Sequence, residues 1–181
     1  MTTALILLPV VVGLAIWILP IPDSWAGPAA TLAALGEIGL WIRALTHFDF
    51  SRGGLQFEQR HAWFRDLHVS YHVGLYGFSL WLVGLTAVAM AAAIAYAWWA
   101  GRERARAYFG LMLFLTGSVV AVFVAQDLLL FYVAWEAMLI PLYLLIGVWG
   151  GPGRLRATVT FVIYTMAGSL AVLIVVFMSV R

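Results

Sequence analysis

Long runs of apolar residues alternate with short polar breaks along this chain of 181 residues. A helix rises about 1.5 Å per residue, so about 20 apolar residues cross the hydrocarbon core of a bilayer. We predict six membrane helices, at residues 3–19, 27–42, 77–99, 108–125, 128–149 and 157–180. The expected fold is therefore all-α, a polytopic membrane bundle of about six transmembrane helices.

One sizeable polar stretch, residues 43–76, separates the second and third predicted helices. It contains all four histidines: His47, His61, His68 and His72. Their spacing is loose and neither a cysteine nor a close pair of carboxylates joins them, so we predict no metal site. An extramembrane loop is expected, with a β-hairpin through residues 67–73. The chain then divides into two N-terminal transmembrane helices (1–43), the extramembrane loop (44–76) and four transmembrane helices (77–181).

The composition agrees with a membrane protein. Apolar residues make up 65% of the chain and charged residues 10%, whereas soluble domains carry about 25% charged residues. With no cysteine the chain has no disulfide, thiolate metal site or cysteine-ligated iron–sulfur cluster. The net charge of +2 does not indicate nucleic-acid binding. The glycine-rich turn at 150–153 lacks the strand-to-helix context of a phosphate loop, and no cofactor site is predicted on this chain.

Arginines predict the orientation, because all ten basic residues are arginine. The short loops after the third and fifth predicted helices carry five of them and lie on one side. The positive-inside rule places these loops in the cytoplasm, with both termini and the histidine-containing loop outside. Four arginines in the long loop, together with Arg181, argue for the opposite orientation. Long loops follow the rule less strictly, so we favour an N-terminus outside a bacterial cytoplasmic membrane.

Glu136 is the most informative residue, because it is the one charged residue in the span 128–149. It lies nine residues after Asp127, about 13–14 Å along a helix and close to the bilayer midplane. A carboxyl at this depth costs about 2.5–3.5 kcal/mol on insertion scales. It therefore requires a partner, a hydrated cavity or a bound proton, and a functional ion or proton site is the favoured interpretation. The alternative is a permanently protonated, structurally inert glutamate.

Four further residues are predicted to support this site. Helical spacing puts Tyr132 and Tyr143 on the same face as Glu136. Pro141 removes a backbone hydrogen bond one turn back, which predicts a kink and a free carbonyl at Ala137. Asp127 is placed to cap the start of the helix at the water interface.

The stretch DLLLFYVAWEAMLIPLYLLIGVWGG at residues 127–151 resembles the proton-pumping, antiporter-like subunits of respiratory complex I, the proton-translocating NADH:quinone oxidoreductase. It is most similar to subunit M, the counterpart of mitochondrial subunit 4. The resemblance extends upstream to GLYGFSL at 74–80 and downstream to FVIYTMAGS at 161–169. Trp135, Glu136 and Pro141 form its most specific part, whereas residues 1–73 match only in layout.

The resemblance implies a membrane-arm subunit in which Glu136 pairs with a lysine on the seventh helix. The protonation of that pair is coupled to quinone reduction elsewhere in the complex. It also implies that NADH, flavin, iron–sulfur clusters and quinone are bound by partner subunits. Family members have about fourteen helices that contain two inverted repeats of five, which is the organisation expected here.

The chain departs from the family pattern at several points. Tyr76 stands where an aspartate is usual, Thr160 stands where a lysine is common, and the chain contains no lysine. It also ends within the first repeat, so we expect the N-terminal part of a longer protein, or else a split subunit. Two other functional classes stay open: a subunit of a multi-subunit cation/proton antiporter or membrane-bound hydrogenase, and an inert truncated scaffold.

Overall fold

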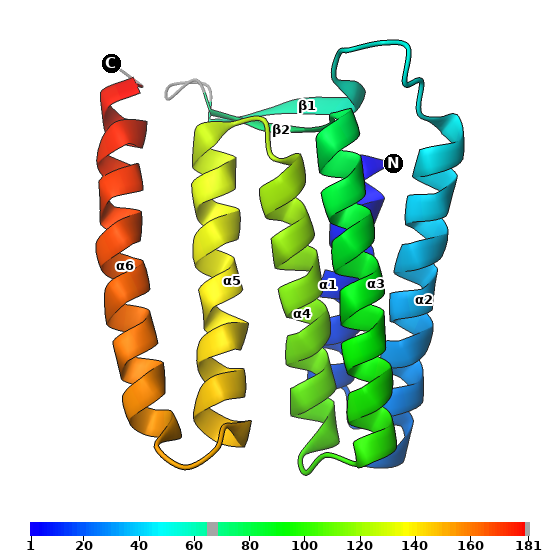
Figure 1. The fold of residues 1–181 in the computed structure, drawn as a ribbon, viewed down its shortest axis with the longest axis vertical. Helices are drawn as coiled ribbons and strands as arrows, with labels where there is room; N and C mark the ends of the chain where they lie inside the picture. The colour runs from blue at the N-terminus through cyan, green and yellow to red at the C-terminus, as the bar shows by residue number, and fades with distance from the viewer. Residues whose placement is uncertain (65–68, 180–181) are drawn as a thin grey trace.

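Apolar helices and one β-hairpin form the computed structural model, which describes residues 1–64 and 69–179 (Figure 1). The elements in chain order are α1 (Thr2–Ile18), α2 (Asp23–His47), β1 (Gln56–Phe64), β2 (Val69–Leu75), α3 (Gly77–Ala100), α4 (Ala105–Val124), α5 (Leu128–Trp149) and α6 (Arg154–Ser179). The helices run side by side, and the hairpin covers one end of the bundle.

The predicted helices all occur, and the bounds of α5 are the predicted ones. Helix α2 differs most, because it begins four residues earlier and ends five residues later than predicted. Its last turn continues past the apolar run, where Ala44 is buried while Arg43 and His47 are exposed. By length and composition, α2 to α6 are each able to cross a membrane, and α1 is shorter, with 17 residues.

Helices α1 to α4 pack together as a four-helix bundle, α5 packs on α4, and α6 packs mainly on α5. The closest approach joins α1 and α4. A Cβ atom on Gly13 would lie 2.7 Å from the carbonyl oxygen of Gly110, and one on Gly110 would lie 2.8 Å from the carbonyl oxygen of Gly13. Because glycine has no side chain, the two backbones meet directly, as small residues permit at helix interfaces within membranes.

The hairpin is larger than predicted and is placed differently. Strand β1 pairs antiparallel with β2 from Gln56 opposite Leu75 to Phe64 opposite Val69, with register shifts at both ends of this ladder. The predicted range 67–73 therefore covers most of β2 but none of β1. Residues 67 and 68 of that range lie outside the described residues.

Side chains of α1 hold the hairpin onto the bundle. The Thr2 hydroxyl donates a hydrogen bond to the carbonyl oxygen of Phe57 at 2.8 Å. The backbone N–H of Thr3 donates to the Gln59 side chain at 3.1 Å, and the Tyr71 hydroxyl donates to the Thr3 hydroxyl at 3.0 Å. These long-range contacts explain why the polar segment folds as a sheet on the helix ends.

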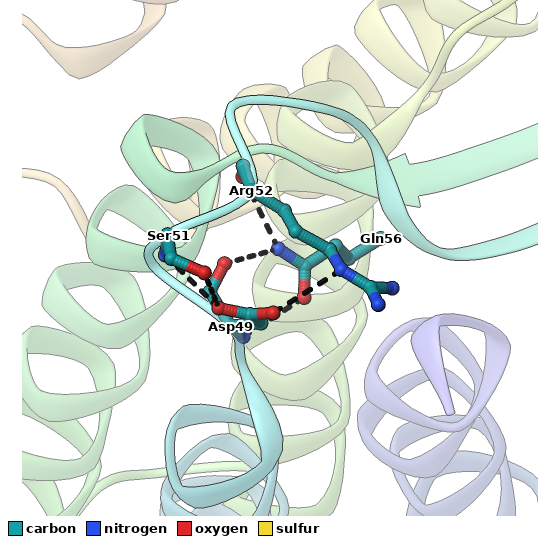
Figure 2. Close-up of polar contacts among 4 residues, drawn as sticks. All are labelled: Asp49, Ser51, Arg52 and Gln56. Atoms are coloured by element: carbon teal, nitrogen blue, oxygen red, sulfur yellow. Dashed lines mark hydrogen bonds and ion pairs between the residues drawn. The ribbon is translucent and has the colours of Figure 1, made fainter.

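A compact turn joins α2 to β1 (Figure 2). Asp49 accepts hydrogen bonds from the hydroxyl and the backbone N–H of Ser51 at 2.5 and 3.0 Å and pairs with Arg52 at 3.2 Å. The Ser51 hydroxyl, more than any other group, lowers the pKa of Asp49 below its ordinary value. Gln56 donates to the Asp49 carbonyl oxygen at 2.7 Å and closes the turn.

Three of the four histidines lie within the described residues, and each contacts a different group. His72 lies 2.7 Å from a carboxyl oxygen of Glu58, His61 stacks against the Tyr71 ring, and His47 contacts the Arg43 carbonyl oxygen at 2.9 Å. His68 lies outside the described residues. The predicted loop is therefore a hydrogen-bonded cap.

The two ends of the bundle give a direct test of topology. The hairpin, the start of α1 and the end of α6 lie at one end, and the loops 101–104 and 150–153 lie at the other (Figure 1). Single cysteines introduced as His61→Cys and Glu103→Cys, both at exposed positions, are expected to react with a membrane-impermeant maleimide from opposite sides. Reaction of both from the same side would contradict this arrangement.

Candidate functional site

Asp127 fixes the start of α5, as predicted. Its side chain accepts hydrogen bonds from the backbone N–H groups of Leu129 and Leu130 at 2.9 and 3.2 Å, which satisfies two free donors of the first turn. Its other carboxyl oxygen accepts from the backbone N–H of Ser70 in β2 at 3.1 Å. The same side chain therefore caps α5 and ties it to the hairpin.

The opposite end of α5 is also anchored. The Trp149 ring N–H donates to the carbonyl oxygen of Glu103 at 2.9 Å, which ties α5 to the loop between α3 and α4. The Arg154 guanidinium donates to the Val148 carbonyl oxygen at 3.0 Å, near the end of the helix, where free carbonyls attract a cation. Helix α5 is thus fixed to the bundle at both ends.

Glu136 lies well inside α5, eight residues from its start, and lines a pocket of about 300 Å³ between α5 and α6. The lining residues are Glu136, Leu139, Ile140, Tyr143 and Leu144 of α5 and Val162 and Met166 of α6. The carboxyl is partly buried, and its Oε1 atom is fully buried without a hydrogen-bond partner among the described residues. A carboxyl in such surroundings is stable when it binds a proton or meets a partner charge.

The structure brings Tyr143 together with Glu136 in this pocket, as helical spacing predicted. Tyr143 and Leu144 also line a second pocket of about 190 Å³, which reaches Thr158 and Leu155 of α6. Leu155 in turn borders a third hollow at the turn 150–155. We call this series of pockets the α5–α6 groove; it leads from Glu136 to the arginine-containing end of the bundle.

Two of the predicted supporting residues lie elsewhere. Tyr132, one turn before Glu136, is partly buried but is not among the described residues that line its pocket. Pro141 is buried within α5, which continues as helix through this position. The predicted role of Pro141 in freeing a carbonyl beside the site stays a prediction.

Comparison with known proteins shows which proteins this chain resembles. Residues 125–180 match the family described as NADH:quinone oxidoreductase/Mrp antiporter, transmembrane. The chain is 39% identical over 177 residues to NAD(P)H-quinone oxidoreductase chain 4 1 of Nostoc, covering 95% of this chain and 32% of that protein. It is 36% identical over 146 residues to F420H2 dehydrogenase subunit M of Methanosarcina mazei, covering 81% of this chain and 30% of that protein.

Solved structures agree with the sequence relatives. The fold matches a chain of respiratory complex I from Thermus thermophilus with a TM-score of 0.77 and 34% identity, covering 94% of this chain and 34% of that chain. Over almost its whole length this chain is therefore similar to antiporter-like subunits of the M/4 type. A chain of the archaeal membrane-bound sulfane sulfur reductase, with a TM-score of 0.75 and 15% identity, shares the fold. The chain spans about a third of the length of the subunit M/4 relatives that it matches.

Sequence reasoning missed a second carboxyl inside the helix bundle. Glu37 of α2 is 1% exposed, and both of its carboxyl oxygens are buried without a hydrogen-bond partner among the described residues. The predicted second helix ended at residue 42, which put Glu37 near its end, whereas α2 continues to His47. The argument that selected Glu136, a lone carboxyl inside an apolar span, would have selected Glu37 had the helix end been predicted correctly.

Proposed function

We propose that this chain forms part of a membrane-arm subunit of a proton-pumping NADH:quinone oxidoreductase, in which Glu136 takes up and releases protons. The observation that carries the proposal is the placement of Glu136 inside α5, eight residues from its start, in a pocket between α5 and α6. The names of the relatives, a quinone oxidoreductase chain and a dehydrogenase subunit, support this class of function.

The surroundings of Glu136 would allow its carboxyl to bind and release a proton. One carboxyl oxygen is enclosed, while the side chain as a whole is only partly buried and borders the α5–α6 groove. Tyr143, whose side chain is 46% exposed, supplies a hydroxyl in the same pocket. A hydroxyl accepts and donates hydrogen bonds, so it is able to pass a proton between the carboxyl and water in the groove.

A switchable charge partner must come from outside residues 1–181. The chain contains no lysine, and the arginines of the helices lie near helix ends: Arg43, Arg106, Arg154 and Arg156. Glu136 is eight residues from the start of α5, about 12 Å along the helix. Burial favours the protonated carboxyl, and a nearby cation favours the ionised one. A cation on another membrane helix that approaches the open side of α5 and α6 would therefore control the proton.

Redox chemistry belongs to partner subunits in this proposal. NADH, flavin, iron–sulfur clusters and quinone are bound there, and this chain contributes to proton transfer across the bilayer. We place the chain in a bacterial cytoplasmic membrane with its N-terminus outside, on the basis of the arginine-containing loops. The division into two N-terminal helices (1–43), an extramembrane loop (44–76) and four further helices (77–181) belongs to the same proposal.

The class of transport is tested with the complete membrane complex in liposomes. Addition of NADH and quinone is expected to generate a pH gradient, detected with an entrapped pH-sensitive dye, without any requirement for sodium. The antiporter alternative is favoured by the family description, which also names Mrp antiporters. It predicts the reverse result, a pH gradient driven by a sodium gradient and insensitive to NADH.

The isolated residues 1–181 are expected not to conduct protons. The chain contains no lysine, and the arginines of its helices lie near helix ends, so no positive charge within these residues is placed to switch Glu136 between proton uptake and release. The measurement is dye-detected proton flux into liposomes that contain the purified chain under an imposed membrane potential. Flux that Glu136→Gln abolishes would show that the site is complete within these residues.

A further inference from the structure

Glu37 is the most deeply buried carboxyl among the described residues, and the proposed function does not use it. It lies ten residues before the end of α2, about 15 Å along the helix, so it is far from either end. Its side chain is enclosed by the chain's own bundle and is 1% exposed. A buried carboxyl whose oxygens have no protein partner requires a physical explanation.

Glu37 lies where two apolar clusters meet. One turn earlier on its face of α2, Ala33 and Ala34 belong to a cluster that includes Leu113 of α4. One turn later, Trp41 packs on a cluster that includes Val120 of α4. Leu113 and Val120 of α4 therefore belong to the clusters on either side of Glu37, and α2 packs on α4. The α4 residues between them are the candidates for contact with the carboxyl.

Thr116 is one of these α4 residues. It shares a helix face with Leu113 and Val120, and its side chain is 2% exposed. Its hydroxyl donates its hydrogen to the Met112 carbonyl oxygen at 2.8 Å. The hydroxyl oxygen keeps its capacity to accept a hydrogen bond. A protonated carboxyl supplies the matching donor, whereas an ionised carboxylate only accepts.

Within residues 1–64 and 69–179, the helices packed around Glu37 carry no charged group near enough to balance its ionised form. Helix α1 carries no titratable side chain, α3 carries Tyr96 in its last turns, and α4 carries Arg106 and Tyr108 in its first turn. Within α2 itself, Asp23 is paired with Arg106 at 2.8 Å, while Arg43 and His47 are exposed in the last turns. Burial of an uncompensated charge costs several kcal/mol, so the neutral form is strongly favoured.

We propose that Glu37 is a second proton-binding site, occupied at neutral pH. In the structure neither carboxyl oxygen makes a hydrogen bond, and we assign the Thr116 hydroxyl as the acceptor toward which the protonated carboxyl turns. Because the chain's own helices enclose Glu37, no other subunit reaches it, in contrast to Glu136. The proton on Glu37 therefore stays bound during turnover. A carboxylate neutralised by a bound sodium ion is the competing arrangement.

Infrared spectroscopy of the complete membrane complex tests the protonation state. At about pH 8, exposed carboxyls are ionised and do not absorb as carboxylic acids. Glu37→Gln is expected to remove one carbonyl-stretch band of a protonated acid, and the exposed control Glu103→Gln is expected to leave that region unchanged. A spectrum that Glu37→Gln leaves unchanged, or a band that grows when sodium is removed, would overturn the proposal.

A second variant keeps the test valid if Glu37→Gln does not assemble. Thr116→Val removes the acceptor and is expected to shift the same band to higher frequency. Thr31→Val, which removes a hydroxyl bonded to its own helix at Gly27, is the matched control and is expected to cause no shift. An unshifted band in Thr116→Val would disprove the hydrogen bond.

The proton flux per electron during turnover distinguishes this proposal from the one for Glu136. Glutamine is a neutral near-isostere of a protonated glutamate, so Glu37→Gln is expected to retain more than half of the proton flux per electron. Loss of flux in Glu37→Gln would show that its proton is exchanged and would overturn the resident-proton proposal. The result for Glu136 is independent of this measurement.

Discussion

Replacement of Glu136 by glutamine is expected to abolish NADH-driven proton pumping in the complete membrane complex, with a loss of about ten-fold or more. Glutamine keeps the size of the side chain and its hydrogen-bonding capacity in the α5–α6 pocket, but it does not bind and release a proton at ordinary pH. Quinone reduction that is coupled to pumping is expected to fall in parallel. The measurement is the initial rate of dye-detected proton uptake by liposomes, with NADH oxidation recorded in the same sample.

Two variants give this experiment its controls. Glu136→Asp keeps the titratable group but shortens it by one methylene, so part of the activity is expected to remain. Glu103→Gln removes a carboxyl from an exposed loop and is expected to pump normally. Normal pumping by Glu136→Gln, in a complex that contains wild-type amounts of the subunit, would establish the inert-scaffold alternative.

Gly13→Ala is expected to disrupt the packing of α1 on α4. The new Cβ atom would lie 2.7 Å from the carbonyl oxygen of Gly110 and 3.0 Å from the Leu113 Cβ atom, and neither can move without displacement of α4. Overpacking of this kind costs about 1–3 kcal/mol, and contact with backbone places this case at the upper end. The expected result is a lower thermal unfolding temperature of the purified protein and a smaller assembled fraction on native gels.

Gly39→Ala is the matched control for this substitution. Gly39 is also within a helix, but a Cβ atom there would have no neighbour within 4 Å. Alanine favours helix over glycine by about 1 kcal/mol, so stability is expected to stay unchanged or to rise slightly. Equal destabilisation by both variants would show that helix flexibility, rather than the contact between α1 and α4, is the cause.

Local sequence signals predicted much of the fold. The bounds of α5 followed from a run between Asp127 and Gly150 that is uncharged except for Glu136, and the capping role of Asp127 followed from its position before that run. Contacts between distant residues were not predicted. The hairpin depends on Thr2 and Thr3 of α1, more than fifty residues away from their partners, and no pattern within residues 43–76 indicates that pairing.

Glu136 and Glu37, the two carboxyls inside the bundle helices, show the same contrast between what local sequence predicts and what it does not. Glu136 was identified because both ends of its apolar run are sharp in the sequence. Glu37 was overlooked because α2 continues through residues 43–47, three of which are polar, and the burial of Ala44 against the neighbouring helices extends the helix into that segment. The depth of a residue within a helix depends on both helix ends, and α2 begins four residues earlier and ends five residues later than the apolar pattern predicted.

The anchoring of α5 has a mechanical consequence for the Glu136 pocket. Asp127 and Trp149 hold α5 rigidly to the hairpin and to the α3–α4 loop, while α6 packs mainly on α5. These two anchors fix the position of Glu136 along the bundle relative to the hairpin at one end and the α3–α4 loop at the other.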